Sequence, residues 1–328
     1  MTDLGIDVHA HHLPAPYMEM LRAGGGPTFG AIHDDATLRK MIEGQDEVGI
    51  SSQILSTGPN SPYLRDEHFA RAAAREVNDA YKQVVERYEG RFFAFGSAPL
   101  PHGEAAAEEA VRCLDELQFT GMHFGCSALG RALDDPDFEE MWSELDKRDA
   151  IIYIHPGGIL CGTEPGLAGM DDAGIAVTIG SAAELATAAL RLAVLCRTHR
   201  RLRVIIGLLG GALPFLLQRV VWLGERFKGK SLLAEDSPDG TLIAQLRRFS
   251  YDTNLLPDPA VIAIARKAYG LDRLLFGSDA PAVMPQVTAS FMREGGLTDE
   301  EFMEVLRHNP RRLFGDRLKS QISQRHAH

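Results

Sequence analysis

Short apolar segments of strand character alternate with longer segments of helical character along almost all of the 328 residues. Between the strand candidates, apolar residues recur three or four positions apart, as in amphipathic helices. Strands that alternate with helices favour a parallel sheet, and eight of them are the number that closes a (β/α)8 barrel. We therefore expect an α/β fold of the (β/α)8 barrel type, with an open doubly wound sheet as the alternative. The strand candidates are Gly5–Val8, Ile50–Leu55, Phe92–Phe95, Phe119–Phe124, Ile151–Ile154, Leu202–Ile206, Phe249–Tyr251 and Arg273–Phe276.

Two capping-box patterns indicate where helices begin. Ser181 is followed three residues later by Glu184, and Thr298 is followed by Glu301. In this pattern each side chain bonds to the other residue's backbone N–H at the first turn of a helix. The sequence therefore predicts helix starts just after Ser181 and just after Thr298.

The chain shows no low-complexity linker or break in composition. We expect one barrel domain over residues 1–316, followed by a polar tail over residues 317–328. A formal net charge of −11 argues against a nucleic-acid partner, because a phosphate-binding surface is basic.

The N-terminus has no basic and apolar segments of the export type. The longest apolar run, residues 204–217, is interrupted by three glycines and Pro214, so no membrane partner is expected. The four cysteines are scattered without C-x-x-C spacing, which favours reduced thiols in a cytoplasmic protein.

The first strand candidate is followed by closely spaced histidines. Side chains alternate along a strand, so His9 and His11 are expected on one side, where two imidazoles can bind one divalent cation. Asp7 shares their parity and is expected either behind them as a hydrogen-bond acceptor or inside the barrel. Histidines bonded to backbone at a polar strand end are the alternative for this segment.

Two more strands end in potential metal ligands. The strand at 151–154 runs into His155, and the strand at 273–276 is followed by Gly277-Ser278-Asp279. In a parallel barrel the C-terminal ends of all strands face one mouth, where active sites form. His9, His11, His155 and Asp279 are therefore expected to converge there on a metal ion.

Taken together, these motifs resemble the amidohydrolase superfamily. More narrowly, the chain is similar to the branch that contains 2-amino-3-carboxymuconate-6-semialdehyde decarboxylase and the γ-resorcylate-type decarboxylases. The likeness runs from Leu4 to about Gly315. Its motifs are the D-x-H-x-H-x-x-P start, the strand that ends in His-Pro, the Gly-Ser-Asp-x-Pro segment, residues 207–215, Tyr251-Asp252-Thr253 and residues 309–314.

The resemblance implies a ligand set and a cofactor. His9, His11, His155 and Asp279 match the family's metal ligands, with zinc the usual ion and manganese the alternative. Asp279 would also act as an acid–base group. Arg219 matches an arginine that reaches the site of a neighbouring subunit to hold a substrate carboxylate, which implies a homodimer.

One position departs from the family pattern. Relatives carry a histidine just before the glycine pair, where this chain has Leu208. That histidine contacts the metal-bound water or the substrate, and leucine cannot replace its proton transfer. His123, near the end of the fourth strand candidate, is the residue we consider as its substitute.

Three functions follow as hypotheses. The first is a metal-dependent, non-oxidative decarboxylase of a small carboxylated aromatic or unsaturated acid, with Asp279 and His123 as catalytic residues. The second is a hydrolase or hydratase of the same superfamily, acting on a lactone or an amide. The third is a barrel that binds a ligand without catalysis, because Leu208 replaces the usual histidine.

Overall fold

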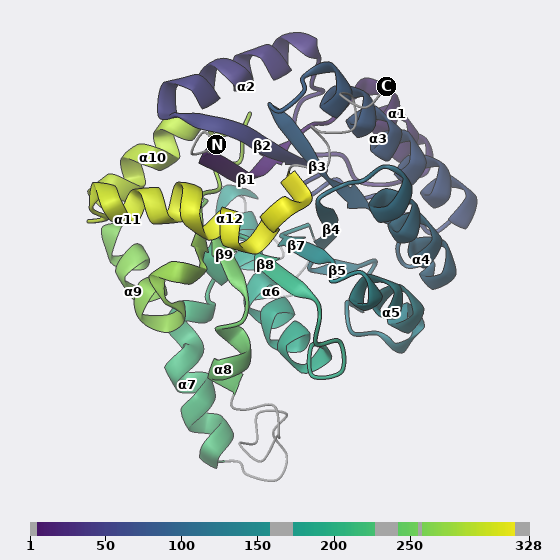
Figure 1. The fold of residues 1–328 in the computed structure, drawn as a ribbon. Helices are drawn as coiled ribbons and strands as arrows, with labels where there is room; N and C mark the ends of the chain where they lie inside the picture. Colours follow the sequence, from purple (N-terminus) through teal and green to yellow (C-terminus); the bar gives the residue numbers. More distant parts are fainter. Residues whose placement is uncertain (1–4, 158–172, 227–241, 255–257, 319–328) are drawn as a thin grey trace.

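The structure is a computed structural model that describes residues 5–157, 173–226, 242–254 and 258–318. Within this part of the chain, parallel strands form an eight-stranded sheet in chain order, β1-β2-β3-β4-β7-β8-β9-β10. Figure 1 shows the strands inside a ring of helices, which is a (β/α)8 barrel. The strands are β1 (Gly5–His11), β2 (Ile50–Ser56), β3 (Phe92–Ser97), β4 (Gly121–Gly125), β7 (Ile151–His155), β8 (Arg203–Ile206), β9 (Ser250–Asp252) and β10 (Leu274–Leu275).

The eight strand candidates of the sequence are all confirmed, with shifts of a few residues at their ends. A short antiparallel hairpin, β5 (Ser127–Ala128) with β6 (Arg131–Ala132), follows β4 and was not expected. Backbone hydrogen bonds close the barrel between its first and last strands, because Val8 donates to the Phe276 carbonyl at 2.9 Å and His11 donates to the Ala280 carbonyl at 2.7 Å.

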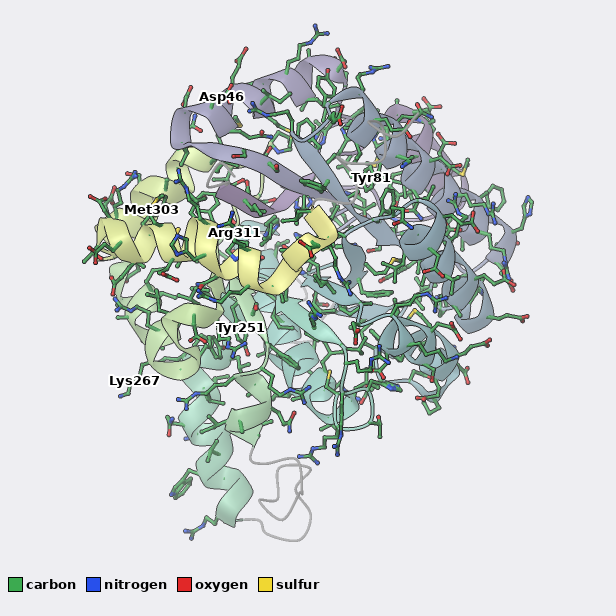
Figure 2. The ribbon with its side chains drawn as sticks, in the orientation of Figure 1. Asp46, Tyr81, Tyr251, Lys267, Met303 and Arg311 are labelled. Carbon is green, nitrogen blue, oxygen red and sulfur yellow. The ribbon has the colours of Figure 1, made fainter. Side chains whose placement is uncertain are left out.

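Helices cover the outside of the barrel, and their apolar faces supply most of the core. Figure 2 shows Tyr81 and Tyr251 inside the ring of helices and Lys267 at its edge, in agreement with the burial of the two tyrosines and the exposure of the lysine. The helices are α1 (Ala15–Ala23), α2 (Asp35–Val48), α3 (Glu67–Arg87), α4 (Gly103–Val111), α5 (Glu139–Lys147), α6 (Ala173–Leu195), α7 (Leu213–Arg226), α8 (Leu242–Leu246), α9 (Pro259–Tyr269), α10 (Pro285–Glu294), α11 (Asp299–Met303) and α12 (Asn309–Phe314).

The C-terminal helices close the end of the barrel at which the strands begin. Figure 1 shows α12 crossing in front of the strands. Phe314 and Leu318 belong to the same buried cluster as Ile6 and Ile151 from the barrel interior. A short helix, Gly315–Leu318, ends the described chain, so most of the polar tail expected at 317–328 lies outside the described residues.

The two helix-start predictions have different outcomes. Thr298 and Glu301 form a capping box at the start of α11, as predicted. Ser181 does not begin a helix, because α6 starts at Ala173 and Ser181 lies in its interior. Apolar residues such as Ile175 and Ile179 extend the helical segment upstream, and Gly180 is tolerated within it at a modest cost.

Helix α6 is long and apolar enough, over Val177–Leu195, to cross a membrane by length and composition alone. Half of that window is buried against the barrel, as in a core helix. Cys113 and Cys196 are buried free thiols, as expected, Cys126 is buried, and Cys161 lies outside the described residues.

Candidate metal centre

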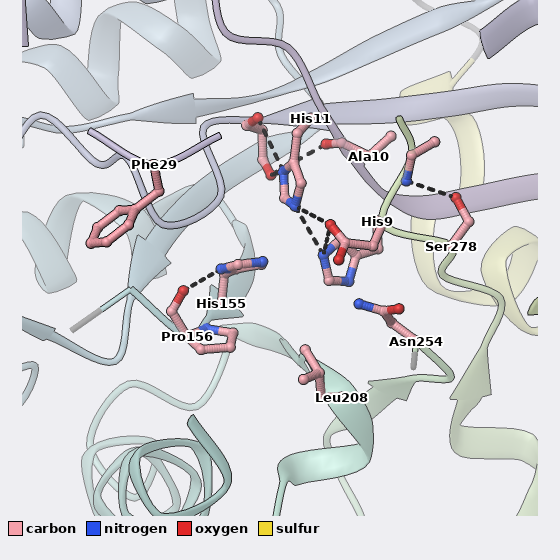
Figure 3. Close-up of polar contacts among 12 residues, drawn as sticks. His9, Ala10, His11, Phe29, His155, Pro156, Leu208, Asn254 and Ser278 are labelled. Carbon is pink, nitrogen blue, oxygen red and sulfur yellow. Dashed lines mark hydrogen bonds and ion pairs between the residues drawn. The ribbon is translucent and has the colours of Figure 1, made fainter. Parts of the chain in front are cut away.

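His9, His11, His155 and Asp279 converge at the mouth of the barrel, as the sequence predicts. Each offers one ligand atom, and these atoms lie within 4.8 Å of one another. The ring centroids of the three histidines are 4.9 Å apart in every pair, so the rings surround a common point. Figure 3 shows the three rings with their nitrogens directed toward that point.

The strands explain why these side chains meet. His9 and His11 are supplied by β1, and His155 is the last residue of β7. Asp279 follows β10 by four residues, and its N–H donates to the His9 carbonyl at 2.8 Å. The backbone bonds that close the barrel therefore also fix the carboxylate beside two of the histidines.

Asp7 does not lie where its parity suggests. The pairing of β1 with β2 is irregular between Asp7 and Ala10, so the simple alternation of side chains is interrupted there. Val8 packs in the barrel interior, whereas the Asp7 carboxylate accepts bonds from Gln53 and Ser278. The carboxylate also accepts the His9 N–H at 3.1 Å, so Asp7 stands behind His9 as a hydrogen-bond acceptor for its backbone rather than its ring, and the alternative that Asp7 fills the interior is wrong.

The separations between the ligand atoms fit a divalent ion. His11 Nε2 lies 2.9 Å from Asp279 Oδ1 and 3.1 Å from His9 Nε2, and His9 Nε2 lies 3.6 Å from Asp279 Oδ1. Bonds of about 2 Å to a tetrahedral zinc ion place two donors roughly 3.3 Å apart. Three imidazoles and one carboxylate are also the donor types that bind zinc and related ions.

Each histidine is oriented through its other ring nitrogen. His9 Nδ1 lies 3.1 Å from Asp252 Oδ2, and His11 Nδ1 lies 3.1 Å from Ser56 Oγ. His155 Nδ1 contacts the Pro156 carbonyl oxygen. These contacts leave Nε2 of each ring for the ion, as in metal sites whose histidines bind oxygen acceptors through the second nitrogen.

Burial and neighbouring charges set the ionisation of the ligands. Burial lowers the pKa of His155 well below its usual 6.5, and His11 and His9 lower it further. Burial would also lower the pKa of His9, but the carboxylates of Asp252 and Asp279 outweigh it and raise that pKa. Burial would raise the pKa of Asp279, but hydrogen bonding and charge from His11 outweigh it and lower that pKa. The carboxylate is thus in the charged form that attracts a cation.

His123 lies inside the barrel next to the centre. It is 1% exposed, its ring centroid is 5.9 Å from that of His155, and its Nδ1 lies 3.2 Å from Thr57 Oγ1. Its Nε2 is buried and has no hydrogen-bond partner within the part of the chain that the structure describes. Burial and the nearby His11 and His9 hold the pKa of His123 well below 6.5, so the ring is neutral at neutral pH.

Leu208 lies beside the centre in Figure 3, in a short turn between β8 and α7. Its backbone N–H donates to Asp252 Oδ1 at 3.1 Å, and its φ of 49° is left-handed. Its half-buried side chain packs against the apolar core and offers no proton-transfer group.

Sequence reasoning missed two residues of this site. Asp252 entered only as part of a family phrase, yet its carboxylate contacts both His9 and the Tyr153 hydroxyl. Asn254, two residues later, is 0% exposed, and its side-chain amide lies beside Asp279 and helps to lower the pKa of that carboxyl. A single aspartate or asparagine after a short strand carries no sequence signal that separates it from a turn residue.

Arg219 is not part of the centre within a single chain. It lies on α7 with an exposed side chain and does not line the cavity at the barrel mouth. Phe215 and Trp222 on the same helix are 78% and 55% exposed. The role of Arg219 in a neighbouring subunit stays a prediction.

A cavity of about 700 Å³ opens from the centre. His11, His155 and Asp279 line its inner end, and the segment from Phe29 to Lys40 supplies much of its outer wall. This volume is in the range of small-molecule sites, with the candidate metal ligands at one end and a mixed wall of apolar, polar and charged side chains elsewhere.

Comparison with known proteins identifies the family. An amidohydrolase family model matches residues 6–315. The 6-methylsalicylic acid decarboxylase acuB of Aspergillus aculeatus is 28% identical over 335 residues, which cover 96% of each chain. Gamma-resorcylate decarboxylase of Rhizobium sp. (strain MTP-10005) is 29% identical over 290 residues, which cover 82% of this chain and 84% of that relative.

Solved structures agree. A 2,6-dihydroxybenzoate decarboxylase crystallised with 2,6-dihydroxybenzoate has a TM-score of 0.78 and 26% identity, covering 95% of this chain and 99% of its own. A dihydroxybenzoic acid decarboxylase of Polaromonas sp. JS666, with bound manganese and the inhibitor 2-nitroresorcinol, shares the fold with a TM-score of 0.80 and 23% identity, covering 98% of this chain and 100% of its own. Its relatives are thus decarboxylases, and the chain belongs to the amidohydrolase family.

Proposed function

We propose that this protein is a metal-dependent, non-oxidative decarboxylase of a carboxylated aromatic or unsaturated acid. The observation that carries the proposal is the convergence of three histidines and Asp279 within 4.8 Å at the inner end of a ligand-sized cavity. Support also comes from relatives that decarboxylate hydroxylated or methylated benzoic acids and match more than four fifths of this chain.

His9, His11, His155 and Asp279 would hold a zinc or a manganese ion. When bound, the ion supplies a Lewis acid for the substrate carboxylate and an adjacent oxygen. The donor set suits zinc, and a carboxylate with imidazoles also accepts manganese. The protein's contribution is to hold the substrate so that the carbon that carries the carboxylate faces a proton donor.

The reaction exchanges a carboxylate for a proton. Asp279 rests as a charged carboxylate and would first take up a proton from solvent. The carbon–carbon bond to the substrate carboxylate then breaks, carbon dioxide leaves, and the same carbon receives that proton from Asp279, which returns to the charged form. No oxidant or reductant is consumed, and each turnover removes one proton from solution.

His123 is the second proton carrier in this proposal. Its Nε2 lies inside the barrel near His155 with no hydrogen-bond partner among the described residues, and because its pKa is held well below 6.5 the ring would take a proton only briefly and release it readily. General acid–base groups must lie within reach of the reacting atom and change protonation state readily. His123 would exchange protons with a substrate hydroxyl, which the apolar side chain of Leu208 cannot do.

Leu208 favours decarboxylation of a bound carboxylate over attack by water. The family histidine helps to deprotonate water, and an apolar residue removes that help. Loss of carbon dioxide from an ionised carboxylate needs no strong base. The apolar side chain also lowers the local polarity around the leaving carboxylate.

Arg219 and a second copy of the chain complete the proposal. We place Arg219 at the site of the partner subunit in a homodimer, where it would hold the substrate carboxylate. The exposed Phe215 and Trp222 on the same helix supply apolar surface for such an interface.

The test is carbon dioxide release. The purified protein, loaded with zinc or manganese, is supplied with hydroxybenzoates, methylsalicylates and muconate-like acids, and carbon dioxide is measured. We expect turnover of at least one acid, and its loss in Asp279→Asn. Asp46→Asn is the control, since Asp46 is an exposed carboxylate on α2 remote from the site.

The same assay separates the alternatives. Product that gains the mass of water would identify a hydrolase or hydratase instead. A protein that takes up no metal and turns over none of these acids would be a binding barrel, and both outcomes reject the proposal.

A further inference from the structure

The outer wall of the cavity is formed by residues 29–37, which join α1 to α2 and begin α2, together with Lys40 of α2. In Figure 3, Phe29 lies on the side of His11 and His155 away from Asn254. None of the metal ligands belongs to this wall. It is therefore the part of the cavity that meets the end of a substrate opposite to the bound carboxylate.

This wall is held by paired hydrogen bonds. The Phe29 N–H donates to Asn60 Oδ1 at 2.6 Å, and Asn60 Nδ2 donates to the Phe29 carbonyl at 3.1 Å. His33 donates its N–H to the Leu13 carbonyl at 2.9 Å, and its Nδ1 accepts the Leu13 N–H at 3.2 Å. The segment is thus fixed to the residues just after β1, which ends with His11.

Two large apolar side chains on this wall are exposed. Phe29 is 46% exposed and Ile32 is 43% exposed, and both line the cavity. Apolar side chains held beside metal-binding groups are expected where a ring of the ligand packs. A flat, apolar ligand that lies between these two side chains and the metal centre would bury them.

Lys40 adds a positive charge to the same wall. It is the one lysine or arginine among the described residues that line the cavity, and its exposed side chain forms no ion pair with the described residues. The nearby Asp34 carboxylate accepts the Thr37 N–H at 2.9 Å and the Thr37 hydroxyl, so it is engaged by the first turn of α2. The lysine ammonium therefore remains available to a ligand.

His33 adds a neutral donor. Because its Nδ1 accepts the Leu13 N–H, the ring hydrogen is on Nε2. A charged ammonium and a neutral N–H from one wall are the donors that suit a carboxylate or a similar oxyanion.

We propose that Lys40 and His33 form a subsite for a second anionic group of the substrate, at the end opposite to the carboxylate that leaves. The substrate class is an aromatic acid with a further acidic substituent, most simply a dicarboxylate. This inference rests on the proposed decarboxylase function. The net charge of −11 repels dianions in general, so a specific cation in the cavity is what would make such a substrate favourable.

The test compares three ligands that share the 2,6-dihydroxybenzoate ring and differ only in the para substituent. They are 2,6-dihydroxybenzoate, its para-carboxylated form 2,6-dihydroxyterephthalate, and the para-carboxamide, which has the size of the dianion without its charge. Affinities for the metal-loaded protein are measured by calorimetry, and carbon dioxide is measured in the same preparation. We expect the dianion to bind at least about tenfold more tightly than the carboxamide, as for a charge-assisted hydrogen bond.

Variants test whether residues of this wall cause the preference for the dianion. Lys40→Gln should remove the preference for the dianion and leave the affinity for 2,6-dihydroxybenzoate within about twofold, whereas Lys40→Arg should keep the preference. His33→Phe should weaken the binding of the dianion by a smaller factor, since this variant loses one neutral hydrogen-bond donor. Lys267→Gln, an exposed lysine on α9, is the control that should change nothing.

The outcomes separate the two proposals. Equal affinity of the wild-type protein for the dianion and the carboxamide, or equal weakening of all three ligands by Lys40→Gln, overturns the subsite. Absence of carbon dioxide from every acid rejects the decarboxylase instead, and the calorimetric preference for the dianion still decides the subsite.

Discussion

Oδ2 of Asp252 lies 3.1 Å from Nδ1 of His9, so a carboxylate from β9 orients a metal ligand from β1. The same carboxylate accepts the Tyr153 hydroxyl at 2.9 Å and the N–H groups of Leu208 and Asn254 at 3.1 and 3.0 Å. Asp252 therefore links β1, β7 and the turn after β8 to one buried group.

Asp252→Asn should weaken metal binding. The change keeps the shape of the side chain but removes the charge that holds the His9 ring, and loss of such a partner typically costs about 10- to 100-fold in metal affinity. Competition between the protein and a chelator for zinc measures this. Asp46→Asn is the matched exposed control, and equal affinities for the wild-type protein and Asp252→Asn would contradict the role of Asp252.

His123→Gln should lower kcat by about 100-fold while the metal content stays that of the wild-type protein. Glutamine fills the site and can still bond to Thr57, but it does not exchange protons, and general acid–base groups contribute about 10²–10⁴-fold. Steady-state kinetics with metal analysis of the same sample check this. Unchanged kcat would exclude His123 as a proton carrier.

Asn254→Leu should leave the metal-free protein as stable as the wild-type protein or more stable. The buried amide makes no well-aligned hydrogen bond within the described residues, although it helps to lower the pKa of the nearby Asp279, and a poorly satisfied polar group costs about 1–3 kcal/mol. Leucine has the same number and branching of side-chain heavy atoms and no polar atoms. Urea unfolding measures the free energy of unfolding, and a loss of more than about 1 kcal/mol would show that the amide has a stabilising contact.

Arg219→Ala and Asp279→Asn should each be inactive alone and active when mixed. If Arg219 serves the partner's site, a mixed dimer contains one site with both functional residues. Subunits are mixed under mild denaturant, refolded and assayed for carbon dioxide release. No recovery in the mixture, with mixed dimers present by mass spectrometry, would place Arg219 outside the catalytic site.

Stability should fall as pH rises above 9, in part through Cys196. Burial raises the pKa of its thiol from 9.0 to about 12, with Asp146 adding to the shift and Arg248 opposing it. Between pH 9 and about pH 12, the unfolded chain loses the thiol proton and the folded chain keeps it. The folded state then loses about 1.4 kcal/mol per pH unit from this group, and below pH 9 there is no effect.

Cys196→Ala isolates this contribution. The variant should be less stable at pH 8, because it leaves a small cavity, but its free energy of unfolding should fall less steeply between pH 9 and 10. Parallel slopes for the variant and the wild-type protein would show that the thiol ionises equally in both states.

The barrel and its ligands could be predicted because both depend on local pattern and on one rule of topology. Alternation gives the strands, and parallel strands place His155 and Asp279 at the same mouth as His9 and His11. The irregular pairing in β1 could not be predicted, because it depends on how β1 meets β2, and it leaves the Asp7 carboxylate bonded to the His9 N–H and to Ser278 rather than to a histidine ring.

The roles of other residues could not be predicted, because they depend on contacts between residues that are far apart in the sequence. Asp252 lies 243 residues from His9, and His33 is fixed by Leu13 through a bond that spans 20 residues. Ser181 shows the opposite error, because a local capping pattern does not start a helix when the residues before it already are helical. Local patterns identify elements, and the roles of single polar residues require the assembled barrel.

The bond from the Asp279 N–H to the His9 carbonyl joins the first strand of the barrel to the segment after the last. A nascent chain that has not yet emerged beyond β10 holds the three histidines but lacks the carboxylate that completes the set. High-affinity ion uptake should therefore require nearly the whole chain, so that metal binding would report the closure of the barrel rather than the folding of any of its parts.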